Sequence, residues 1–284
     1  MAGIRIVTDS TADLPSGLVQ EFNITVVPLI VRFGSEVLHE GTEITNAQFY
    51  HRLTVDPDHP STSQPSPGEF ITAYQSISES ADDIISIHIT SELSGTYDSA
   101  TRAGASDEVT VPVHVVDSRS SSIALGSLVV LAAERARDGV AVPEILAELH
   151  GWIARSRTCF LLDTLEYLRR GGRIGAGRAF LGSLLRVKPV FHIVNGVVEP
   201  LDRARSPRKA ADRILRYLHE EAGDGRLAYV GILRATDREL ADLLQTRIEA
   251  EFEVGRWFHT QIGAVLGTHL GPGAVGIAFP ARET

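Results

Sequence analysis

The sequence predicts an α/β protein with two domains, the first built on a parallel, helix-covered sheet and the second on a mixed or antiparallel sheet with helices. Short apolar segments alternate with helix-start signals over residues 1–160, which is typical of a parallel sheet. After residue 160 a hairpin signal appears, and 284 residues are enough for two cores. We therefore predict an N-terminal domain at 1–160 and a C-terminal domain at 161–284.

In the first domain, β-branched or apolar runs predict the strands, and Ser, Thr or Pro at the start predicts the helices. The clearest helix start is Ser66-Pro-Gly-Glu69, with an N-cap Ser, Pro at the first helical position and Glu three residues after the cap. The predicted strands are 4–7, 24–31, its hairpin partner 33–38, 84–89 and 109–116. The helices begin near 16, 45, 66, 90, 117 and 143, and 56–65 is a polar loop.

The second domain begins with a strand at 159–162, a helix at 164–169, a glycine-rich loop at 170–177 and a Leu-rich helix. Asn195-Gly196 predicts a hairpin between 188–194 and 196–199. Helices at 206–220 and 237–250 and strands at 227–233 and 255–260 follow. Residues 267–276 hold four glycines and a proline around His269. Because Gly permits tight turns, we predict a loop with His269 at its tip that leads into a buried strand.

Composition excludes several classes of function. The net charge is −9, and no basic stripe interleaved with aromatic residues is found, so we expect no nucleic-acid partner. Cys159 is the only cysteine, which allows no intramolecular disulfide. The first residues carry no signal-peptide pattern, and the longest apolar run, 123–133, is too short for a membrane span. We expect a cytoplasmic protein without a membrane span.

Three hydroxyl-rich turns follow predicted strands of the first domain, at 8–11, 91–96 and 117–122. In a doubly wound sheet, ligands bind beyond the carboxyl ends of the strands, where helix N-termini offer free N–H groups to an anion. Ser94-Gly95 is the best candidate, because Gly lets a ligand approach the amides closely. The alternative is that each serine only caps its helix.

Other chemistries find less support. Ser94, His269 and Asp117 could form a triad, but no Gly-x-Ser-x-Gly motif occurs. No P-loop motif and no metal-ligand spacing of His, Cys and carboxylates are present, so we expect neither a nucleotide cradle nor a metal. Arg173, in the glycine-rich loop, and Arg205 are either solvated surface residues or cations that neutralise a phosphate or contact a partner.

Six motifs in one order give the sequence a family resemblance. They are Thr-Asp-Ser-Thr-Ala-Asp-Leu-Pro at 8–15, Thr-Ser-Gln-Pro-Ser at 62–66, Leu-Ser-Gly-Thr-Tyr at 93–97, Leu-Arg-Arg-Gly-Gly-Arg-Ile at 168–174, Val-Lys-Pro at 187–189 and Gly-Thr-His-Leu-Gly-Pro-Gly-Ala at 267–274. Over essentially the whole chain, the sequence resembles the DegV family of fatty-acid-binding proteins, which includes the binding subunit of bacterial fatty acid kinase.

The resemblance implies a long-chain fatty acid between two α/β domains. Its carboxylate would be held by Thr62 and Ser94, with His269 and Arg173 beside the head group. A separate ATP-binding kinase subunit would phosphorylate the acid to an acyl phosphate. Arg205 would contact that subunit; the family's basic-x-Arg-Thr pattern is Arg-Ala-Arg-Ser at 203–206 here, with Ser in place of Thr at its end.

Physical chemistry agrees with this picture, because a buried carboxylate needs hydrogen bonds or a cation, which the two hydroxyls, the imidazole and the amides near Gly95 could supply. The tail needs an apolar tunnel, for which we predict Phe160, Leu161, Leu165, Phe180, Leu181, Leu184, Leu185 and Ile193. Each of these is equally consistent with ordinary core. We expect a lipid-binding subunit without a complete active site or a cofactor. The alternatives are a stand-alone lipid hydrolase or acyltransferase using Ser94, and a lipid-responsive regulatory binder without a kinase partner.

Overall fold

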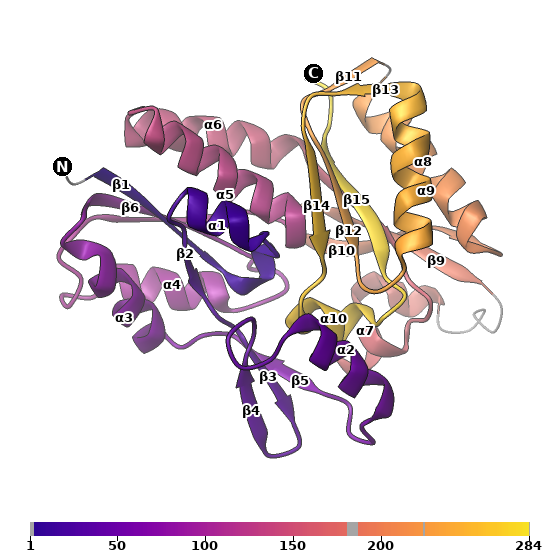
Figure 1. The fold of residues 1–284 in the computed structure, drawn as a ribbon, viewed down its shortest axis with the longest axis horizontal. Helices are drawn as coiled ribbons and strands as arrows, with labels where there is room; N and C mark the ends of the chain where they lie inside the picture. The colour runs from indigo at the N-terminus through magenta and orange to yellow at the C-terminus, as the bar shows by residue number, and fades with distance from the viewer. Residues whose placement is uncertain (1–2, 181–186, 224, 284) are drawn as a thin grey trace.

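The first domain is built on a parallel four-stranded sheet with the strand order β2-β1-β6-β7. The structure, a computed structural model, describes residues 3–180, 187–223 and 225–283. Helices α3 and α4 pack on one face of the sheet, and α5 and α6 lie on the other (Figure 1). The strands are β1 (Gly3–Asp9), β2 (Thr25–Val27), β6 (Ala81–His88) and β7 (Val113–Asp117); the helices are α1 (Ser16–Glu21), α3 (Pro67–Ser78), α4 (Thr96–Gly104), α5 (Ser122–Arg137) and α6 (Val142–Arg155).

The second domain is built on a mixed six-stranded sheet with the order β10-β9-β8-β15-β12-β14, in which only the β12–β14 pair is parallel. Helices α8 and α9 pack on one face, and α5 of the first domain packs on the other. The predicted two-domain α/β architecture is thus confirmed. The strands are β8 (Ser156–Leu161), β9 (Lys188–Val194), β10 (Val197–Ala204), β12 (Val230–Arg234), β14 (Trp257–Gln261) and β15 (Val275–Pro280), with α8 (Pro207–Ala222) and α9 (Arg238–Glu251); β11 (Gly225–Leu227) and β13 (Phe252–Val254) form a separate pair.

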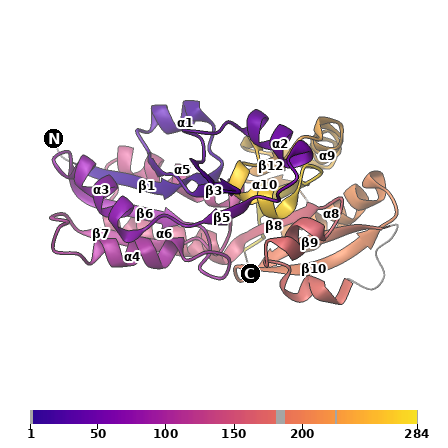
Figure 2. The ribbon, with the colours of Figure 1, turned by 90° about the horizontal axis from the view of Figure 1, so that it is seen from below.

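Helix α5 connects the two domains physically. Most of its residues are buried, and it contacts strands of both sheets. In Figure 2 the elements of the two domains lie side by side along the elongated molecule. The change from the parallel to the mixed sheet falls between α6 and β8. The predicted boundary at residue 160 therefore lies within a strand of the second sheet. The exact domain boundary stays a prediction. Among the described residues, no helix is long and apolar enough to cross a membrane.

A small antiparallel sheet, β4-β3-β5, extends from the first domain toward the second (Figure 1). The predicted strand 24–31 is divided in two, because Pro28 lacks the N–H that a continuous ladder requires. Part of the predicted polar loop is strand β5, which pairs with β3. The elements are β3 (Ile30–Phe33), β4 (Glu36–His39), β5 (Ser61–Ser63) and α2 (Asn46–Val55).

The predicted loop around His269 is wrong in its first half. Helix α10 (Ala264–Leu270) contains His269 in its last turn, and α7 (Glu166–Arg170) packs against it. Gly267 serves packing instead of a turn, since a Cβ there would lie 2.7 Å from the Phe49 ring and 2.8 Å from Tyr50 Oη. The turn begins only at Gly271, whose φ of +79° ends the helix.

Candidate functional site

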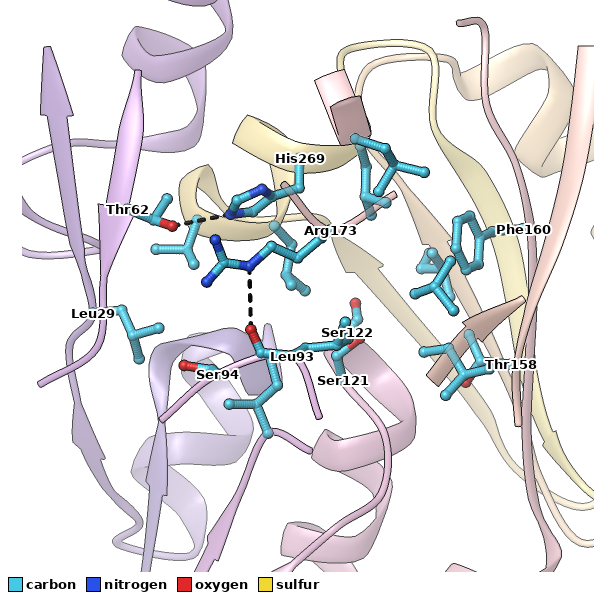
Figure 3. Close-up of a pocket in the computed structure, with 18 of the residues that line it drawn as sticks. Leu29, Thr62, Leu93, Ser94, Ser121, Ser122, Thr158, Phe160, Arg173 and His269 are labelled. Atoms are coloured by element: carbon cyan, nitrogen blue, oxygen red, sulfur yellow. Dashed lines mark hydrogen bonds between the residues drawn. The ribbon is translucent and has the colours of Figure 1, made fainter. Parts of the chain in front are cut away.

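A cavity lies between the two domains, a common location for small-molecule sites. Its wall is mainly apolar and is drawn from both halves of the chain, with Leu29, Ile89 and Leu93 from the first domain and Leu233, Val265 and Leu266 from the second. Polar side chains line the same cavity, among them Thr62, Ser94, Arg173 and His269 (Figure 3). The cavity therefore combines a mainly apolar wall with a set of polar side chains.

Thr62 and His269 are brought into direct contact, although 207 positions separate them. Thr62 lies on strand β5, and its Oγ1 is 3.0 Å from His269 Nε2. The imidazole also packs against Gly171, where an added Cβ would lie 2.0 Å from Nδ1. The backbone itself does not require glycine here, since the φ of Gly171 is an ordinary −74°. Glycine is required because any larger side chain would collide with the histidine ring.

His269 is neutral at physiological pH. Burial, together with the charges of Arg173 and His59, lowers its pKa from 6.5 to about 4. Its Nδ1 is buried and has no hydrogen-bond partner among the described residues. A neutral imidazole can either donate or accept through Nε2, and the Thr62 hydroxyl adapts to either tautomer.

Ser94 and Gly95 form the turn between β6 and α4. Ser94 Oγ is 2.8 Å from Thr96 Oγ1 and accepts a bond from Thr96 N at 3.4 Å. Gly95 is the N-cap of α4, and a Cβ there would lie 2.7 Å from Gln64 Nε2. Gln64 also lines the cavity, although it was not predicted as a site residue. Its position two residues after Thr62, in the Thr-Ser-Gln-Pro-Ser motif, was the available signal.

Arg173 spans the mouth of the cavity on the side of Ser94. Its Nε donates to Leu93 O at 3.3 Å and its Nη1 to Gly171 O at 2.9 Å, while the side chain stays exposed (Figure 3). A second, polar cleft lies outside, and its lining includes Ser91, Glu92, Ser94, Gly95, Gly172 and Arg173. Because Ser94 and Arg173 border both spaces, a group bound between them would be reachable from solvent.

Not every predicted residue reaches this cavity. Arg205 is exposed and lines neither the cavity nor the outer cleft. The turn at 8–11 also lies elsewhere: Asp9 accepts bonds from Thr11 and from His88 Nδ1 at 3.0 Å, and Ser10 Oγ accepts from Leu29 N. Two of the three hydroxyl-rich turns meet at the cavity, and the third stabilises the first domain.

The predicted tunnel wall is placed only in part. Phe160 and Ile193 line the cavity. Successive residues of a strand point to opposite faces, so Leu161 faces away from Phe160 and packs in the core beneath α8 and α9. Leu165 is buried in the interdomain core without lining the cavity. The Phe180 side chain, Leu181, Leu184 and Leu185 lie outside the described residues.

The triad geometry does not form. Asp117 accepts from Ser91 Oγ at 2.7 Å and Arg119 N at 2.9 Å, Ser94 bonds to Thr96, and His269 bonds to Thr62. A nucleophilic serine needs its base within hydrogen-bond reach. Within residues 3–180, 187–223 and 225–283, no group of three or more His, Cys, Asp or Glu side chains could hold a metal ion.

Comparison with known proteins places this architecture in a family. A family model described as an uncharacterised protein of the DegV family matches residues 3–282. Protein DegV of Bacillus subtilis is 36% identical over 277 residues, which cover 97% of this chain and 98% of that protein. The two domains and their sheets recur in solved structures of the family.

Two of these structures were described with fatty acids. A fatty-acid-binding DegV family protein from Thermus thermophilus is 35% identical, with a TM-score of 0.92 over 99% of this chain and 100% of that chain. A stearic-acid-binding protein from Eubacterium ventriosum is 26% identical, with a TM-score of 0.87 over 99% of this chain and 98% of that one. The match over nearly the full length and the 36% identity decide the assignment: the chain belongs to the DegV family.

Proposed function

We propose that this protein binds a long-chain fatty acid in the interdomain cavity, with the carboxylate at Thr62, Ser94 and His269. The observation that supports the proposal is a mainly apolar interdomain cavity whose lining includes Ser94 and the hydrogen-bonded pair Thr62 and His269. Solved relatives described as binding a fatty acid and stearic acid support it. The acid is the ligand, and no further cofactor is part of the proposal.

The polar group suits an anion. A desolvated carboxylate requires hydrogen bonds or a nearby cation. The hydroxyls of Thr62 and Ser94, the amides near Gly95 and the neutral imidazole of His269 supply donors, and the Arg173 guanidinium supplies the charge. The tail supplies most of the affinity, since roughly fifteen methylenes at about 0.8 kcal/mol each contribute about 12 kcal/mol before the costs of ordering.

The fatty acid can be tested directly. The protein, purified without added lipid, is extracted with organic solvent, and the extract is analysed by mass spectrometry. We expect one equivalent of a long-chain free acid, which Ser94→Ala and Thr62→Val proteins retain less well. An extract with no long-chain acid, together with no binding of added octadecanoic acid by calorimetry, would refute the proposal.

We further propose that the bound carboxylate is presented to an ATP-dependent kinase, which converts it to an acyl phosphate in the same compartment, the cytoplasm. The outer cleft gives a partner access to the space between Ser94 and Arg173. Arg173 would offset the charge of the transferred phosphoryl group, and the exposed Arg205 would contact the kinase.

This second step has its own test. With ATP and a fatty acid kinase present, hydroxylamine should trap an acyl hydroxamate; without the kinase, no product should form. Arg205→Ala should slow turnover and leave fatty-acid affinity unchanged, whereas Arg226→Ala, an exposed residue on the remote strand β11 (Figure 1), should change neither. Product formation without kinase, or labelling of Ser94 by a fluorophosphonate, would favour the hydrolase alternative.

A further inference from the structure

The tail region of the interdomain cavity contains hydroxyl groups that a plain hydrocarbon chain cannot satisfy. Ser121, Ser122 and Thr158 line the cavity together with the apolar residues. They come from the start of α5 and from β8, and Figure 3 shows them across the cavity from Thr62. Thr158 lies on the same face of β8 as Phe160, two positions away, so both side chains face the cavity.

The Ser121 hydroxyl has no hydrogen-bond partner in the part of the chain that the structure describes. It is the N-cap of α5, yet its side chain makes no capping bond, and the residue is 8% exposed. Its Oγ is not among the fully buried side-chain atoms that lack a partner. Because Ser121 lines the cavity, we take this unpaired hydroxyl to be accessible from the cavity. Its neighbours differ: Ser122 Oγ donates to Asp13 Oδ2 at 2.6 Å, and Thr158 Oγ1 is 3.3 Å from Ser120 Oγ.

The start of α5 favours an oxygen atom at this place. The first amides of a helix have no intrahelical acceptor, and they carry a partial positive charge. Helix α5 has 16 residues, and the capping hydroxyl that could occupy these amides is unused. A full anion is disfavoured there, because the mainly apolar wall of the cavity would desolvate it. The environment therefore suits a neutral oxygen that accepts a hydrogen bond.

We propose that the preferred ligand is an oxygenated long-chain fatty acid, whose hydroxyl or keto group along the chain bonds to Ser121 at the start of α5. This inference depends on the proposed fatty-acid function. A methylene chain at this position would displace water from Ser121 and leave its hydroxyl unpaired, which weakens binding. An oxygen substituent at the matching carbon restores the bond, so position along the chain decides the preference.

The test compares octadecanoic acid with its 2-, 3-, 10- and 12-hydroxy derivatives by calorimetry. We expect one hydroxy isomer to bind at least about fivefold more tightly than octadecanoic acid, the ratio that one recovered hydrogen bond supplies. Ser121→Ala should abolish that ratio and bind octadecanoic acid at least as tightly as the original protein. Ser99→Ala, a buried serine of α4 outside the cavity lining, should leave the ratio unchanged.

The outcomes separate the two proposals. If no acid binds, the proposed fatty-acid function fails. If octadecanoic acid binds as tightly as every hydroxy isomer, or if the preference persists in Ser121→Ala, the function stands and the oxygenated ligand is refuted. Mass spectrometry of the extracted native lipid gives an independent result: an acid with an additional oxygen supports the inference, and only unsubstituted acids contradict it.

Discussion

Substituting Gly171 by alanine should detach His269 from Thr62 without disturbing the backbone. The added Cβ would lie 2.0 Å from His269 Nδ1 and 2.7 Å from its Cε1, far inside ordinary contact distance. Gly171 has φ −74° and ψ −7°, which alanine adopts freely. The conflict is therefore confined to the imidazole, which must move by roughly 1.5 Å to reach normal contact.

That movement has two measurable consequences. Its first effect is loss of the 3.0 Å Thr62–His269 bond and of the imidazole as a partner of the carboxylate, at a cost of about 1–3 kcal/mol, or about 5- to 150-fold in affinity. Its second effect is on titration. Burial holds the pKa of His269 down at about 4, so an imidazole displaced toward solvent should titrate closer to 6.5.

Calorimetry with octadecanoic acid measures the first effect, and NMR of the His269 ring as a function of pH measures the second. Gly151→Ala is a matched control, because a Cβ at Gly151 would meet nothing within 4 Å. Normal affinity in Gly171→Ala with an unchanged, depressed His269 pKa would refute the steric argument. Normal affinity with a raised pKa would show instead that His269 does not contribute to binding.

Three further predictions follow from the same contacts. Thr62→Val should weaken fatty-acid binding about tenfold by calorimetry, because His269 Nε2 is left without its partner. Ile193→Trp should fill the cavity, so that octanoic acid still binds while octadecanoic acid does not; equal loss of both acids would point to misfolding. Burial raises the pKa of Glu40, whose Oε1 accepts from Val265 N at 2.8 Å. A raised carboxyl pKa gives stability that is present below about pH 4 and lost as pH rises through the folded-state pKa. The free energy of unfolding in urea of Glu40→Gln, relative to that of the original protein, should therefore increase from pH 4 to pH 7.5, and a constant difference would contradict this.

The sequence predicts the alternation of elements well and the site unevenly. Strand and helix starts are local properties, so Ser66-Pro67 and Asn195-Gly196 mark their elements correctly. A glycine in the sequence can indicate either a turn or close packing. Gly267 is explained by packing against Phe49 and Tyr50, which are far away in the sequence. For the same reason Leu29 could not be assigned to the cavity in advance. The error at Leu161 could have been avoided from the sequence. Successive side chains of a strand point to opposite faces, so Leu161 and Phe160 cannot both face the cavity.

The position of α5 makes ligand binding and domain packing parts of one equilibrium. Its buried residues contact both sheets, and the residues at its start line the cavity. The apolar wall of the cavity belongs to the same core that joins the domains, since Leu29, Ile89, Phe160, Ile193 and Leu233 are all members of it. A tail in the cavity thus adds contacts to the interdomain core itself, and a ligand that binds only the folded state stabilises it by mass action. Because separating the domains would expose both the tail and this core to water, the bound acid should leave mainly by its polar end, past Ser94 and Arg173, where the outer cleft lies.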